Sequence, residues 1–202
     1  MDTFDAILGG TDELYIDLVK NALEKRVLIF NEEVTDAVVE NYVMRIIFWN
    51  QEDKDLPIEK RQPIKIFINS PGGDAVVCFN MVNAIEASKT PVIGICLGLT
   101  ASAAYYVLLA CHERIAFKDS VILQHDGSIN ISHSTSKAKD VMNFFDNMEE
   151  RTKQHVLTHT KMDSDFYDLH FDQEFYMYPD QAKELGVIDK IIGEDVDLDY
   201  IL

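Results

Sequence analysis

The chain has 202 residues, 47% of them hydrophobic, and its 35 acidic and 18 basic side chains give a formal net charge of −17. That length and apolar content predict one compact domain with a sizeable core. The negative charge argues against a nucleic-acid partner or an anionic membrane surface, because both require a basic face. No apolar run is long enough to span a bilayer, and residues 1–10 lack the basic residues of a signal or transit peptide. We therefore expect a cytoplasmic protein.

Strands and helices are predicted to alternate along the chain. Residues 1–24 form an N-terminal segment with a mobile lead-in at Gly9-Gly10 and a short amphipathic helix over 14–23. Apolar runs predict strands over 26–30, 64–69, 92–97, 114–117, 121–124 and 187–192. Helical spacing predicts helices over 35–49, 75–88, 103–110, 137–160, 163–171 and 179–185, with a charged surface loop over 51–63 and an acidic tail over 194–202. This alternation predicts an α/β domain with mostly parallel strand pairing.

The three cysteines, Cys78, Cys96 and Cys111, lie in apolar surroundings and form no C-x-x-C pair. An odd number of such cysteines predicts buried, reduced thiols in a reducing compartment. None lies at a polar turn, so a cysteine nucleophile is disfavoured.

Ser102 lies where the strand that begins at Val92 ends and the apolar helix Ala103–Ala110 begins. Backbone N–H groups at a helix N-terminus have no partner within the helix, and the helix dipole favours negative charge there. The hydroxyl can therefore cap the helix. Alternatively, it can be a nucleophile whose oxyanion forms beside free N–H donors.

A glycine turn, Asn69-Ser70-Pro71-Gly72-Gly73, follows another strand and precedes another helix. It lacks the G-x-G-x-x-G pattern and the Lys-Ser/Thr ending of phosphate-binding loops. The two glycines permit positive φ and close approach of another backbone. The turn is thus either purely structural or a rail along which a peptide or acyl group lies, with one N–H as an oxyanion donor.

Two groups of histidines could carry chemistry. His125 ends a strand directly before an Asp-Gly turn, which is a suitable position for a general base pointing into a cleft. Its orienting acid would come from Asp165, Asp168, Asp172 or Glu174, among which sequence spacing does not choose. His155 and His159 have the spacing of a metal-binding pair on a helix, but no Glu lies between them and no third ligand is evident nearby. We therefore expect a solvated helix face there and no metal site.

Four motifs in order carry a family resemblance. They are Ile68-Asn69-Ser70-Pro71-Gly72-Gly73, Gly98-Leu99-Thr100-Ala101-Ser102-Ala103, Val121-Ile122-Leu123-Gln124-His125 and Ala182-Lys183-Glu184-Leu185-Gly186-Val187-Ile188-Asp189-Lys190-Ile191. Together they resemble the proteolytic subunit family of the Clp protease (ClpP), from about residue 25 to 193. The chain departs from the family pattern at three places: Ala103 stands where a methionine is usual, Gln124-His125-Asp126-Gly127 replaces the usual I-H-Q-P, and Glu174 stands where an aspartate is usual.

The resemblance implies a crotonase-like fold, a spiral of β-β-α units, with a protruding long-helix handle at about residues 128–160. It implies that Ser102 is the nucleophile and His125 the general base, with Glu174 as the acid and Asp172 as the alternative acid. It further implies oxyanion donors at the backbone of Gly73 and Ala103, substrate contacts at Gly72 and Gly127, and no metal or organic cofactor.

The implied function is a serine endopeptidase that cleaves unfolded polypeptides or short peptides inside a homo-oligomeric ring chamber, with an AAA+ ATPase unfoldase as partner. Three alternatives remain open at the level of sequence. One is a non-catalytic ring subunit, suggested by the altered residues around Ser102 and His125. The second is a crotonase-type acyl-CoA enzyme, in which the same N–H groups polarise a thioester. The third is a phage capsid-maturation protease.

Overall fold

The computed structural model describes residues 11–128, 132 and 134–202 of the chain. Its centre is a sheet in which β1 (Val27–Phe30), β2 (Ile64–Ser70), β3 (Val92–Ala101), β4 (Glu113–Phe117) and β7 (Lys190–Ile192) lie side by side in that order. β5 (Val121–Gln124) pairs with the far end of β3, and β6 (Phe175–Met177) pairs with β5. Only the β5–β6 pairing is antiparallel among these strands, so the predicted, mostly parallel α/β fold is confirmed.

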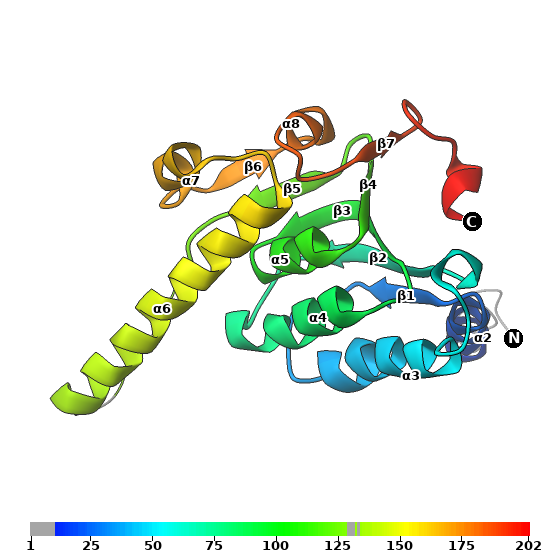
Figure 1. Cartoon of the computed structure of the whole chain (residues 1–202), viewed down its shortest axis with the longest axis horizontal. Coiled ribbons are helices and arrows are strands. Elements are labelled where there is room, and N and C mark those ends of the chain that lie inside the picture. The colour runs from blue at the N-terminus through cyan, green and yellow to red at the C-terminus, as the bar shows by residue number, and fades with distance from the viewer. Residues whose placement is uncertain (1–10, 129–131, 133) are drawn as a thin grey trace, which may run out of the picture.

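Apart from the longest helix, α6 (Thr135–His159), the α-helices occupy three regions around this sheet (Figure 1). α2 (Thr11–Glu24) lies beside β1, whereas α3 (Met44–Glu52), α4 (Ala75–Ala87) and α5 (Ala103–Ala110) stack along one side of the sheet. α7 (Ser164–His170) and α8 (Pro179–Glu184) lie near β6. Short turns of other helix types are η1 (Val39–Val43), η2 (Ile58–Lys60) and η3 (Leu198–Ile201). Of the described helices, none has both the length and the apolar character needed to cross a bilayer.

Helix α5 is the centre of the core. All eight of its residues are buried, including Tyr105, Leu108 and Leu109, which are fully enclosed. A helix that is apolar on every side must be surrounded by protein. Small residues at its start let it lie close to the ends of the strands, and this placement fixes the position of Ser102.

Helix α6 (Thr135–His159) projects from the body at its N-terminal end (Figure 1). Its C-terminal half packs on the core through Thr152, His155 and Val156. Along the projecting part, Met142 and Phe144 expose about half of their surface, 45% and 51%. The long helix therefore has an anchored half and a projecting half on which Met142 and Phe144 are largely exposed.

The predicted surface loop over 51–63 is wrong at two charged residues. Asp53 is 3% exposed and Arg61 is 8% exposed. The Asp53 carboxylate can be buried because it accepts a hydrogen bond from Arg26 over 2.9 Å and another from the Thr90 hydroxyl over 2.9 Å. Burial of a charge is tolerated where hydrogen bonds and an opposite charge compensate it. The composition of the segment gave no sign of these distant partners.

The acidic tail lies against the sheet. Ile201 is 3% exposed, and Lys65 donates to the carbonyl of Leu202 over 2.6 Å. Val196 also forms an isolated bridge with Ile192. At the other terminus, the predicted Gly9-Gly10 lead-in lies outside the described residues.

Candidate active site

Three loops meet at one edge of the sheet because they follow three neighbouring parallel strands. β2 pairs with β3 through Ser70 and Thr100, and β3 pairs with β5 through Ala101 and Leu123. The carboxyl ends of parallel strands lie at the same edge of a sheet, where ligands commonly bind. The glycine turn after β2, Ser102 after β3 and His125 after β5 therefore converge.

Ser102 has a strained backbone, with φ 53° and ψ −124°. Positive φ is uncommon for a residue with a Cβ, and such strain persists only where the surroundings enforce it. Here the Ser102 N–H donates to the carbonyl of Leu123 over 3.0 Å, which holds the serine beside β5. The side chain makes no capping hydrogen bond to α5, so the interpretation of Ser102 as a helix cap is wrong.

Glu174 reaches His125 because of strand register. Gln124 pairs with Phe175 in the antiparallel β5–β6 ladder, so the next positions, His125 and Glu174, face each other. The Glu174 Oε1 atom lies 2.8 Å from His125 Nδ1. A carboxylate can only accept, so Nδ1 carries the proton and the lone pair of the neutral ring is on Nε2. The ring is thereby oriented as a general base requires.

Among the other candidate acids, Asp168 is engaged by Lys153, whose Nζ donates over 2.6 Å. Asp165 and Asp172 are exposed. No hydrogen bond among the described residues joins either of them to His125. The structure thus brings Glu174, and not Asp172, to the imidazole. Strand β6, which sets this register, was not predicted from the sequence because its three residues are too short for a periodicity signal.

The glycine turn packs closely against Ser102. A Cβ on Gly72, which has φ +91°, would lie 2.7 Å from Ser102 Cβ and 2.8 Å from the Ala103 nitrogen. A Cβ on Gly73, with φ +148°, would lie 2.5 Å from the carbonyl oxygen of Val34. Both positions therefore require glycine for space and for backbone conformation.

Two N–H groups are free at this junction. Val34 forms an isolated β-bridge with Gly73: the Val34 N–H donates to the Gly72 carbonyl, and the Val34 carbonyl accepts from the Asp74 N–H. The Gly73 N–H therefore points away from Val34. The Ala103 N–H is at the first position of α5, where no intrahelical acceptor exists. Among the described residues, neither of these N–H groups has an acceptor, and the Ser102 hydroxyl has no hydrogen-bond partner. Gly127 is exposed, with nothing within 4 Å of the place of a Cβ.

The cysteines lie apart from this chemistry. All three are free and buried. Burial raises the pKa of both Cys78 and Cys96 to about 12, so neither is a thiolate near neutral pH.

The predicted solvated face at His155 and His159 is wrong for His155, which is only 8% exposed. A third potential ligand, Glu86 of α4, lies beside both rings, with its Oε1 atom 3.3 Å from His155 Nδ1 and 3.6 Å from His159 Nε2. The sequence could not indicate this, because Glu86 belongs to a different helix.

Comparison with known proteins identifies the family of the chain. The model of the Clp protease family matches residues 10–195. The chain is 25% identical to the ATP-dependent Clp protease proteolytic subunit 3 of Parasynechococcus marenigrum (strain WH8102), over 92% of this chain and 91% of that protein. It is 27% identical to subunit 2 of Prochlorococcus marinus (strain MIT 9313), with 92% and 91% covered. Against subunit 1 of P. marinus (strain MIT 9312) the identity is 26%, with 92% and 93% covered.

Proposed function

Because the chain belongs to the Clp protease family, we propose that it is a serine-type endopeptidase acting on unfolded polypeptides or short peptides. Ser102 attacks the scissile carbonyl, and His125 Nε2 takes the hydroxyl proton and returns it to the leaving amine. Glu174 keeps the imidazole in the required tautomer and stabilises the imidazolium as it forms. The N–H groups of Gly73 and Ala103 donate to the oxyanion.

The observation that carries this proposal is the 2.8 Å contact between Glu174 and His125, set by strand register beside a serine in a strained conformation. The Ser102 hydroxyl and the His125 ring have no mutual hydrogen bond among the described residues. Catalytic hydrogen bonds often tighten only when substrate binds, so this geometry is compatible with the mechanism. The glycine turn and Gly127 would bind substrate backbone on either side of the serine.

We propose that the active form is a homo-oligomeric ring that encloses the active sites. Two observations support this: α6 projects from the body with Met142 and Phe144 exposed, and α2 exposes Leu14 and Tyr15 by 74% and 66%. Neighbouring exposed apolar side chains mark interaction surfaces, and α2 exposes Ile16 and Leu18 as well. The similar proteins of P. marenigrum and P. marinus are named as proteolytic subunits of ATP-dependent Clp proteases. An AAA+ ATPase is therefore the partner we propose for unfolding substrates, in a reducing compartment such as the cytoplasm.

A fluorophosphonate probe tests the nucleophile directly. Labelling of the assembled full chain should map to Ser102 and be lost in Ser102→Ala, together with hydrolysis of a fluorogenic peptide. Cys78→Ser is a matched control, because Cys78 is buried with a raised pKa and should not take part. Mass photometry of the same sample reports the oligomeric state.

Failure of labelling in a folded, oligomeric sample would contradict the mechanism. That result would favour a ring subunit that contributes to assembly and not to hydrolysis. Tight binding of coenzyme A in a calorimeter would instead favour an acyl-CoA enzyme.

A further inference from the structure

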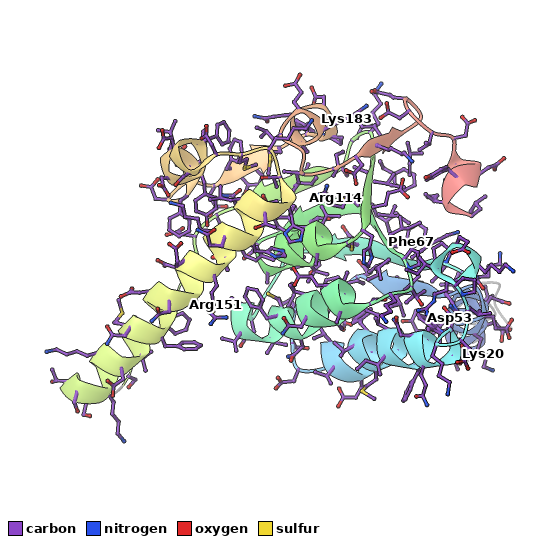
Figure 2. All side chains as sticks on the ribbon, in the orientation of Figure 1. Lys20, Asp53, Phe67, Arg114, Arg151 and Lys183 are labelled. Carbon is purple, nitrogen blue, oxygen red and sulfur yellow. The ribbon has the colours of Figure 1, made fainter. Side chains whose placement is uncertain are left out.

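Glu86, His155 and His159 form a cluster between α4 and the anchored half of α6, away from the proposed peptidase site. One atom from each side chain, Glu86 Oε1, His155 Nδ1 and His159 Nε2, lies within 4.8 Å of the other two. The cluster lines an open groove of about 730 Å³, so an ion from solvent can reach it. Figure 2 labels Arg151, which lines the same groove.

The remaining ring nitrogens fix the tautomers of both histidines. His155 Nε2 lies 3.0 Å from the carbonyl oxygen of Tyr106, and His159 Nδ1 lies 2.8 Å from the carbonyl oxygen of His155. A carbonyl oxygen only accepts, so each of these nitrogens carries a proton. In the neutral rings, the lone pairs of His155 Nδ1 and His159 Nε2 therefore both face Glu86.

A neutral cluster would place three acceptors against one another with no proton between them. A positive ion between the three atoms removes the repulsion. Histidines that bind metals typically donate their second N–H to a carbonyl or carboxylate, which is the arrangement found here.

We propose that Glu86, His155 and His159 bind a divalent transition-metal ion, for which Zn²⁺ is the test probe. Imidazole nitrogens and a carboxylate oxygen form a suitable donor set for Zn²⁺, with bonds of about 2.0–2.2 Å. Tetrahedral ligands at that distance lie roughly 3.3–3.5 Å apart, close to the separations of 3.3 and 3.6 Å between Glu86 and the two rings. The groove leaves the fourth position to water.

The ion would join α4 to α6, which both line the groove. Glu86 is in the last turn of α4 and the histidines are in the last two turns of α6. A metal bridge here would hold the anchored half of α6 to the body. Its occupancy would thus affect the rigidity of the long helix and not the hydrolytic chemistry.

The test is titration of the tag-free full chain with Zn²⁺ by calorimetry, and with Co²⁺ by visible absorption. We expect one strong site per chain, d–d bands typical of a four-coordinate nitrogen and oxygen site, and a higher melting temperature with Zn²⁺. Glu86→Gln and His159→Gln should each weaken binding by roughly tenfold or more and abolish the thermal shift. Both residues are partly exposed, so these variants should fold.

Two matched controls sharpen the result. His170 donates to the Phe166 carbonyl over 2.8 Å, as His159 does to His155, but lies outside the cluster. Glu150 lines the groove without belonging to the cluster. His170→Gln and Glu150→Gln should keep the wild-type affinity. The proposal is overturned if no 1:1 binding occurs, or if Glu86→Gln and His159→Gln bind Zn²⁺ as tightly as the controls do.

Discussion

Two carboxylates in this molecule each bind a nitrogen-containing side chain, one pair at the surface and the other buried. Glu174 lies 2.8 Å from His125 with 58% of its side chain exposed. Asp53 is bound by Arg26, and only 4% of the Asp53 side chain and 12% of the Arg26 side chain are exposed. Figure 2 labels Asp53 close to α3, on the opposite side of the fold from β6.

The difference in exposure separates the roles of the two pairs. Exposed ion pairs contribute little to stability because water screens them. The Glu174–His125 pair can therefore be altered to change chemistry while the fold remains. In the buried pair, loss of one partner leaves an uncompensated charge, which is strongly destabilising. The Arg26–Asp53 pair should affect folding with little direct effect on catalysis.

The largest expected effect is on catalysis at the exposed pair. Glu174→Gln keeps the size of the side chain but removes the charge that stabilises the imidazolium. We expect kcat to fall on the order of 10²- to 10⁴-fold, while the free energy of unfolding changes by about 0.5 kcal/mol or less. Peptide hydrolysis and urea unfolding of the same preparation measure the two quantities.

The matched control for this variant is Asp172→Asn, which removes an exposed carboxylate two residues earlier. It should keep wild-type kcat. If Asp172→Asn lowers kcat more than Glu174→Gln does, the orienting acid has been assigned to the wrong residue.

The second effect concerns the glycine turn. Gly73→Ala places a Cβ against the carbonyl of Val34 and displaces the N–H that we assign to the oxyanion. We expect kcat to fall roughly 10²- to 10³-fold, with labelling of Ser102 by a fluorophosphonate also slowed. Equal activity in Gly73→Ala and the wild type would remove Gly73 from the oxyanion site.

The third effect is on folding at the buried pair. Asp53→Asn leaves the Arg26 guanidinium without its main partner and should lower the free energy of unfolding by about 3 kcal/mol. Glu52→Gln is the control: Glu52 contacts the same Arg26 but is 64% exposed, so its loss should change little. Urea unfolding at neutral pH makes the comparison. Similar destabilisation by both variants would show that burial is not what separates the two pairs.

The Glu174–His125 and Arg26–Asp53 pairs also show which features of a site can be predicted from a sequence. His125 was found because it follows an apolar strand and precedes a turn, both of which are local signals. Glu174 is the expected acid, with Asp172 as the alternative, only through the resemblance to a known family. The reason for its position is the register of β6, a pairing between segments far apart in the chain.

The Arg26–Asp53 pair and the Glu86–His155–His159 cluster were missed for the same reason. Local patterns predicted the strands that carry the core and nearly all of the helices, because periodicity is a property of one segment. Partners from different elements leave no such pattern. A charged stretch around Asp53 therefore indicated a surface loop, and two histidines without a neighbouring acid indicated a solvated face.

The smallest expected effect is the pH dependence of the contribution that the buried Arg26–Asp53 pair makes to the free energy of unfolding. The hydrogen bond and charge of Arg26 hold the pKa of Asp53 below its usual value, which is about 3.9 in an unfolded chain. Its contribution to stability is therefore fully present above about pH 4 and is lost as the pH falls through the lower pKa of the folded state. The difference in unfolding free energy between the wild type and Asp53→Asn should accordingly be constant above about pH 4 and narrow as the pH falls below about pH 4 toward the lower pKa of the folded state. Urea unfolding at a series of pH values measures it, and a difference that stays constant over this lower range would mean that the Asp53 charge is not what stabilises the fold.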